Sequence, residues 1–183
     1  MDFYEQFCLA AETSGAVLVD CKCPADAVEY IVKHADGGVL VPSSDSCGRV
    51  DLAGQLQKAG ATLLEVNRAQ AAMSAAGVTS ACFAIADTGT LVLESTPEDV
   101  RLASTLPTRH FVLLDRSKIV ADGLAAVDSL RRMHQRNTRN YIAYITGPSR
   151  TADIERVLTI GVHGPKELYI LLLDDWSSDL LEM

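Results

Sequence analysis

The sequence predicts one α/β domain over residues 1–183, in which helices cover a mixed β-sheet. Its length of 183 residues is within the range of about 100–200 residues that is typical of one domain. Short apolar runs alternate with longer stretches of helical period, which is typical of parallel strands connected by helices. Near the middle, two apolar runs are joined by Ala86-Asp87-Thr88-Gly89 alone, a connection too short for a helical crossover. We therefore expect antiparallel as well as parallel neighbours.

The first third of the chain alternates helices with strands. Residues 2–14 predict a helix that ends at Gly15, and residues 16–19 predict the first strand. Pro24 suits the first turn of the next helix, where its missing N–H would be unpaired anyway, and that helix should end before Gly37. The pattern then predicts a strand at 39–41, a loop at 42–48, a helix at about 50–58 and a strand at 61–66.

The rest of the chain continues with strands and two longer helices. Residues 81–85 and 90–93 predict the antiparallel pair, and residues 111–114 return to strand. Ser117 is suited to cap a helix whose apolar residues recur at three- and four-residue spacing from Ile119 onward. The pattern closes with a strand at 141–146, a helix at 151–159 and a strand at 168–174.

Composition excludes several classes of protein. The formal charge of −8 and the absence of a basic stretch argue against nucleic-acid binding, which needs clustered Lys and Arg. No apolar run approaches the roughly 18 residues that a membrane span requires. The acidic first residues differ from the basic start of a signal peptide, so the sequence predicts a soluble, cytoplasmic protein.

The cysteines do not form a recognisable metal or cluster site. They are odd in number and scattered, and Cys21-Lys22-Cys23 is not the C-x-x-C spacing of redox or zinc sites. Iron–sulfur clusters use runs of cysteine at two- and three-residue intervals, and such a run does not occur. Neither a dinucleotide nor a P-loop motif is present. We therefore expect no metal and no cofactor in this chain.

The strongest local signal for a ligand site is the stretch from residue 141 to residue 155. An apolar strand runs through Gly147 and Pro148 into the predicted helix, and such corners at the carboxyl ends of strands bind ligands in open α/β sheets. Free N–H groups there, with Ser149, Thr151 and the Arg150 guanidinium, would suit a carboxylate or phosphate. Ser149 or Thr151 could equally be a simple helix cap, since Asp153 and Glu155 already place negative charge on the first turn.

Two further places are candidates. Asp87-Thr88-Gly89-Thr90 contains the triplet of aspartic proteases, but one copy cannot provide the two carboxylates that share a proton, so a hairpin turn is favoured. A functional version would place its threonine hydroxyls and N–H groups in a shared cleft. His163, within Gly161-Val162-His163-Gly164-Pro165, is the one titratable group of a turn whose glycines permit positive φ. It is either a hydrogen-bonding spacer or a base.

A group of cationic residues flanks Leu106-Pro107. Arg101, Arg109 and His110 could supply positive charge to an acidic substrate, or they could simply be solvated.

Several motifs occur together and in order along the chain. They are Gly77-Val78-Thr79, residues 84–93, Arg101-Leu102, Leu106-Pro107, His110, the Thr-Gly-Pro-Ser-Arg-Thr-Ala-Asp-Ile-Glu block at 146–155, and residues 161–165. In this combination the chain resembles the LUD domain family, the lactate-utilisation proteins typified by LutC. The resemblance is specific from about Gly77 to Asp174.

The resemblance implies a fold and a functional context. The family's fold is similar to that of the sugar-phosphate isomerase and CoA-transferase group (NagB/RpiA/CoA transferase-like), a three-layer α/β arrangement. Its members are linked to bacterial oxidation of L-lactate to pyruvate, alongside partner proteins that carry iron–sulfur clusters. The resemblance therefore implies a LutC-like accessory subunit that binds a small organic acid or a cluster-bearing partner.

The family's shared positions correspond here to a set of candidate site residues. They are Thr88, Gly89, Thr90, Arg101, Gly147, Ser149, Arg150, Thr151, Asp153, Glu155 and His163. Arg150 and the amide groups after Gly147 would hold the acid, and His163 or Asp153 would handle a proton. Many relatives have Glu in place of Asp87 and a longer amino end. Two other functions stay open: a stand-alone enzyme acting on a phosphate, carboxylate or CoA ester, and a non-catalytic interaction module.

Overall fold

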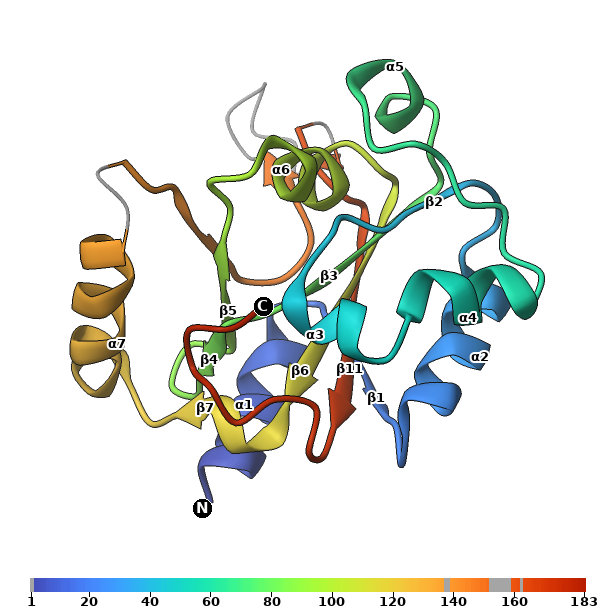
Figure 1. The fold of residues 1–183 in the computed structure, drawn as a ribbon. Coiled ribbons are helices and arrows are strands. Elements are labelled where there is room, and N and C mark those ends of the chain that lie inside the picture. The colour runs from blue at the N-terminus through green and yellow to red at the C-terminus, as the bar shows by residue number, and fades with distance from the viewer. Residues whose placement is uncertain (1, 137–138, 152–158, 162) are drawn as a thin grey trace.

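The computed structural model describes residues 2–136, 139–151, 159–161 and 163–183, and their strands form two main β-sheets (Figure 1). The larger sheet consists of β1 (Val17–Asp20), β2 (Val39–Leu40), β3 (Ala76–Ser80), β6 (Arg109–Asp115) and β11 (Glu167–Leu173). Its order is β1-β11-β6-β3-β2, and all neighbours are parallel. The central strands β6 and β11 are largely apolar because both faces of the sheet are covered.

The second sheet is mixed and contains the predicted antiparallel pair. It consists of β4 (Phe83–Ile85), β5 (Thr90–Glu94), β7 (Ile119–Val120) and β8 (Ile142–Ile145), in the order β7-β4-β5-β8. β5 is antiparallel to both β4 and β8, whereas β7 is parallel to β4. A short antiparallel ribbon of β9 (Arg150–Thr151) and β10 (Thr159–Ile160) follows β8.

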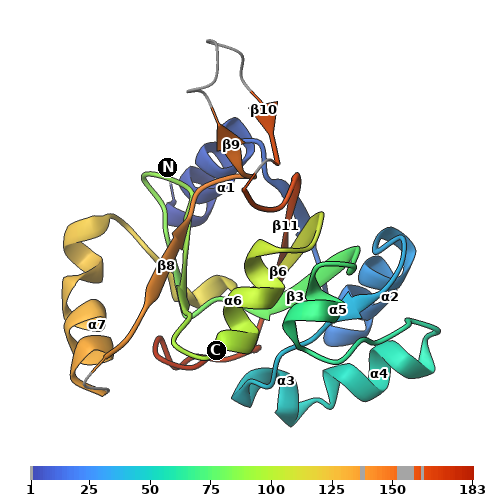
Figure 2. The ribbon, with the colours of Figure 1, turned by 90° about the horizontal axis from the view of Figure 1, so that it is seen from above.

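Helices surround the two sheets. Seven α-helices and one short 3-10 helix are found in the described residues: α1 (Phe3–Thr13), α2 (Pro24–His34), α3 (Asp45–Arg49), α4 (Leu52–Lys58), α5 (Arg68–Ala71), α6 (Glu98–Thr105), η1 (Arg116–Lys118) and α7 (Gly123–Arg136). Figure 2 shows α7 beside the second sheet on one side of the molecule, and α2 and α4 on the opposite side.

The buried residues form a core between each pair of layers. On one face of the parallel sheet, Ile31 and Leu56 from the helices pack against Phe111 and Leu171. The other face packs against α1 and the second sheet, whose outer face in turn packs against Met133 of α7. The strands are thus divided between two sheets in four successive layers, helices, sheet, sheet and helix. The expected three-layer arrangement around one mixed sheet is wrong in this respect, because the β4–β5 pair packs onto the parallel sheet instead of extending it.

Some predicted elements differ from the structure. Residues 42–48 were expected to be a loop but contain the start of α3, whose cap Ser44 accepts a hydrogen bond from the backbone of Cys47. Residues 61–66 were expected to be a strand but contribute only a bridge between Val39 and Leu63. The helix expected from Ser117 begins at Gly123, since β-branched Ile119 and Val120 pair with β4. Strand β3 and helix α6 were not predicted.

The helix expected at 151–159 is contradicted at both ends. Arg150 and Thr151 form β9, and Thr159 and Ile160 form the strand that pairs with it. Residues 152–158 lie outside the described residues. The chain therefore does not pass from β8 directly into a helix.

Gly77 allows β3 to lie directly beneath α6. A Cβ atom at this position would overlap the backbone carbonyl oxygen of Ala103. Overpacking of this kind typically costs about 1–3 kcal/mol. We expect Gly77→Ala to lower the free energy of unfolding by this amount in urea denaturation. Gly123→Ala is the matched control, because nothing lies within 4 Å of a Cβ there. Equal stability of the two variants would contradict the close packing of α6 on β3.

Candidate functional site

The pairing of β5 with β8 brings the 87–90 turn next to the exit of β8. Leu91 lies opposite Ile145 in this pair. The hydroxyl of Thr90 is 2.7 Å from that of Thr88 and 2.8 Å from that of Thr146. Thr88 and Thr90 thus form a continuous chain of hydroxyl groups with the residue that precedes Gly147. The two distant segments meet as the sequence predicted, but Thr88, Gly89 and Thr90 are not among the residues that line the cavity described below, so the shared cleft expected there is not supported.

Glycines at both segments allow them to pack on the end of α1. Gly89 and Gly147 have positive φ angles of 64° and 71°. A Cβ at Gly89 would overlap the backbone of Ala11, and one at Gly147 would overlap the carbonyl oxygen of Ser14. Both glycines are therefore required by a positive φ and by a close backbone approach.

The segment after Gly147 is held against the turn that ends at Pro165. The backbone N–H of Ser149 donates to the carbonyl of Pro165 at 2.9 Å, and that of Gly161 donates to the carbonyl of Ser149 at 2.8 Å. A Cβ at Gly164 would lie 3.0 Å from the Cβ of Ser149. The two motifs that lie apart in the sequence are thus one structural unit.

This unit borders a cavity of about 430 Å³. The end of α6 and the first residues of β6 and β11 complete its wall. Its lining residues are Ser104, Thr105, His110, residues 143–150, His163, Gly164, Pro165 and Leu168. Serine, threonine, arginine and histidine residues thus line the same space as several apolar residues, a combination suited to a small polar ligand.

Arg150 and His163 are both exposed where they line this cavity. The Arg150 guanidinium donates one hydrogen bond of 2.5 Å, from Nη2 to the carbonyl oxygen of Ser14. Because a guanidinium has five N–H donors, this bond orients the side chain and leaves capacity for a carboxylate. Ser14, the C-cap of α1, thus contributes to the site, and no motif of the sequence marks this role.

His110 is a buried, neutral member of the cavity wall. Its exposed fraction is 1%, and its Nε2 lies 2.8 Å from the hydroxyl of Thr79. Burial lowers the pKa of the imidazole to about 3. The expectation that His110 supplies positive charge is therefore wrong. Its pairing with Thr79 depends on the register of β3 and β6, which the sequence did not reveal.

Arg109 also differs from its expected role. Its guanidinium forms ion pairs with Glu167 at 2.9 Å and with Asp36 at 3.3 Å. Its charge is already balanced by acidic residues of this chain.

Arg101 lies outside the cavity and binds the backbone of the segment that follows β5. It donates to the backbone carbonyls of Ser95 and Thr96, and its guanidinium lies over the ring of Tyr141 at 5.3 Å from the centroid. It does not line the cavity. Its inclusion among the ligand-binding residues is not supported by this geometry.

The other candidates are only partly placed. The backbone of Thr151 belongs to β9, so it cannot cap a helix there. Asp153 and Glu155 lie outside the described residues. The expected anion site at a helix start is therefore wrong, and the hydroxyls and guanidinium of the cavity are what could hold an acid.

The described residues contain no group of three or more His, Cys, Asp or Glu side chains that could hold a metal ion. All five cysteines are free thiols. Burial raises the pKa of Cys21 and of Cys82 to about 11, which disfavours the thiolate form that ligates metals. Among the helices of the described part of the chain, none has both the length and the apolar character of a membrane span.

Comparisons with known proteins give consistent results. The LUD domain matches residues 4–173. The lactate utilization protein C of Anoxybacillus flavithermus is 29% identical over 180 residues, which are 95% of this chain and 80% of that protein. The lactate utilization protein C of Bacillus subtilis is 39% identical over 113 residues, which are 60% of this chain and 47% of that protein.

A solved structure supports the fold. The crystal structure of a DUF162 family protein from Deinococcus radiodurans matches with a TM-score of 0.63 and 18% sequence identity, over 93% of this chain and 96% of that protein. The α/β fold, with a parallel five-stranded sheet and a second mixed sheet, is thus shared with this protein.

The low pKa of His110 makes stability depend on pH. In the unfolded chain the imidazole binds a proton near pH 6.5, whereas in the folded chain it does so only near pH 3. Above pH 6.5 the imidazole is neutral in both states, so it does not oppose folding. As the pH falls from 6.5 towards 3, the unfolded chain binds a proton that the folded chain does not, and the free energy of unfolding decreases. We expect this one proton to contribute a slope of about 1.4 kcal/mol per pH unit to the free energy of unfolding between these values.

Urea denaturation of His110→Gln between pH 6.5 and 4 measures this contribution. The variant should lack it, whereas Thr79→Val, which retains the imidazole, should keep it. Identical slopes for the wild-type chain and His110→Gln would contradict a buried neutral histidine.

Proposed function

Because this chain belongs to the LUD domain family, we propose that it is a LutC-like component of a system that oxidises L-lactate to pyruvate. The observation that carries the proposal is the similarity to a lactate utilization protein C along 95% of this chain. The proposal includes a cytoplasmic location and a fold related to the sugar-phosphate isomerase and CoA-transferase group.

Within that system, the chain binds a small organic acid in the cavity between residues 143–150 and 163–165. Arg150 is the cationic side chain that would receive the carboxylate, with the hydroxyls of Ser149 and Thr105 beside it. His163 stands exposed at the same wall and would move a proton to or from the ligand. The buried neutral His110 would contribute a hydrogen bond without adding charge.

Redox centres belong to partner proteins in this proposal. Conversion of lactate to pyruvate removes two electrons, which require an acceptor. The raised thiol pKa values of Cys21 and Cys82, and the scattered positions of all five cysteines, are unsuited to holding an iron–sulfur cluster in this chain. The chain would therefore act beside cluster-bearing proteins, as an accessory subunit.

Deletion of the encoding gene tests the role. We expect loss of growth on L-lactate as sole carbon source, restored by the wild-type chain and restored less well by Arg150→Gln. Arg131→Gln is the control, because this exposed arginine lies away from the cavity and pairs with Asp128 on the same helix. Unchanged growth and unchanged lactate oxidation after deletion would reject the proposal.

Thermal unfolding in the presence of L-lactate or pyruvate tests the binding site. A ligand at about 100 times its Kd should stabilise the chain by about 2.7 kcal/mol. Arg150→Gln should abolish the shift in Tm, whereas Arg131→Gln should retain it. A shift that persists in Arg150→Gln would place the ligand elsewhere. Turnover of a phosphate or CoA ester by the isolated chain would instead favour a stand-alone enzyme.

A further inference from the structure

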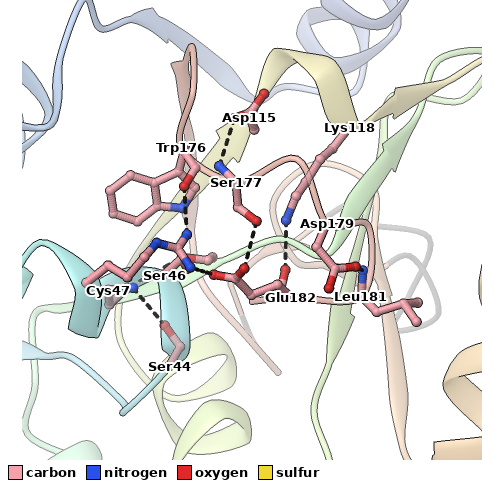
Figure 3. A network of polar contacts seen from close by, with 12 residues as sticks. Ser44, Ser46, Cys47, Asp115, Lys118, Trp176, Ser177, Asp179, Leu181 and Glu182 are labelled. Atoms are coloured by element: carbon pink, nitrogen blue, oxygen red, sulfur yellow. Dashed lines mark hydrogen bonds and ion pairs between the residues drawn. The ribbon is translucent and has the colours of Figure 1, made fainter.

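A second polar site lies at the carboxyl ends of the strands of the parallel sheet. β3 ends at Ser80 and β6 ends at Asp115, and the hydroxyl of Ser80 lies 3.0 Å from that of Ser46 and 3.5 Å from the thiol of Cys47. In open α/β sheets this is the edge at which ligands bind. Residues 176–183, here called the covering segment, occupy it (Figure 3).

Three cationic side chains from three different elements hold the covering segment. Arg49 of α3 pairs with the Glu182 carboxylate and donates to the carbonyl of Trp176 at 2.8 Å. Lys118 of η1 donates to the backbone carbonyl of Glu182 at 2.8 Å. Arg136 of α7 donates to the carbonyl of Leu181 at 3.1 Å. Most of these contacts go to backbone oxygens, which carry only partial negative charge.

Lys118 is the most deeply buried of these cations. Its exposed fraction is 1%, and it forms no ion pair with a carboxylate in the described part of the chain. Burial lowers the pKa of Lys118, and the nearby carboxylates of Glu182, Asp115 and Asp179 oppose this without direct ion-pair contact. The Asp115 carboxylate accepts hydrogen bonds from Ser117 and Ser177. A buried ammonium group is stabilised far better by a hydrogen-bonded carboxylate than by one carbonyl.

The covering segment also fills the site incompletely. The indole Nε1 of Trp176 is buried and has no hydrogen-bond partner within the described ranges. A cavity of about 220 Å³ remains beside Glu182, bordered by Ser44, Met133 and Arg136 among others. Asp45 and Glu94 also border this cavity, and the Glu94 carboxylate accepts hydrogen bonds from Thr96.

The contacts of Glu182 define the chemistry of the ligand. Figure 3 shows its side-chain carboxylate and its backbone carbonyl held at separate points of the network. These two groups are the ends of a chain of five carbon atoms. A five-carbon dicarboxylate would present one carboxylate to Arg49, as Glu182 does, and would offer Lys118 a carboxylate oxygen in place of the Glu182 backbone carbonyl.

We propose that this edge of the parallel sheet is a binding site for a small dicarboxylate, in which Glu182 of the covering segment takes the ligand's place. The dicarboxylate displaces the covering segment, and the carboxylates of Glu182 and Asp179 leave with it. The site shares no lining residue with the cavity of Arg150, so it is independent of the lactate proposal.

Trp176 reports directly on this displacement because it is the only tryptophan of the chain, and it is 5% exposed. Glutarate is the probe, titrated into the full chain at constant ionic strength, with butyrate as the monocarboxylate control. We expect a saturable red shift of tryptophan emission with glutarate and none with butyrate. The absence of a saturable change, or equal changes with both acids, would overturn the proposal.

Variants separate a binding site from a permanent structural plug. Glu182→Gln weakens the competing segment, so glutarate should bind about tenfold more tightly than to the wild-type chain. Arg49→Gln, whose side chain is 48% exposed, and Lys118→Met should each weaken binding at least tenfold. Arg150→Gln should leave it unchanged. Circular dichroism confirms folding of each variant. A response that persists in both Arg49→Gln and Lys118→Met would overturn the assignment, as would unchanged affinity in Glu182→Gln.

Discussion

The antiparallel pairing of β5 with β8 is the constraint on which the candidate site depends. It sets Leu91 opposite Ile145, and this register places the hydroxyls of Thr88, Thr90 and Thr146 in one chain. The next residue, Gly147, then turns on the end of α1 with a positive φ. A one-residue slip of β8 would exchange the faces of its side chains and move this turn away from Pro165. The site is therefore produced by sheet register as much as by its own residues.

The spacing of apolar residues and the turn residues predicted those elements that depend on nearby sequence alone. The helix at Pro24, the β4–β5 pair and the apolar strand β11 were all confirmed. Ile119 and Val120 had helical spacing, yet they pair with β4 because a strand from a distant part of the chain is available to them. Strand β3 was not predicted because Gly77 interrupts its apolar pattern. The reason for a glycine there is the close approach of α6, which only the folded structure shows. The division into two sheets depends on such long-range packing.

The candidate site was predicted only in part. The contact of the Thr88–Thr90 turn with the segment after Ile145 was confirmed, but the turn does not line the cavity. Arg101 binds backbone carbonyls elsewhere, and the expected helix start is a strand. The network of Arg49, Lys118 and Glu182 was missed entirely, because its members lie far apart in the sequence and match no motif. Charge pairing of this kind becomes visible only when the ends of β3, β6 and β11 are brought to one edge of the sheet.

Amide chemical shifts measured during titration with L-lactate show whether the segments around Gly147 and Gly164 border one acid-binding cavity. We expect saturable shifts at Gly147, Ser149 and Gly164 with one common Kd, and no shift at Ser46 or Ser177 at the opposite edge of the parallel sheet. Shifts confined to other parts of the chain, or different Kd values at Ser149 and Gly164, would contradict it.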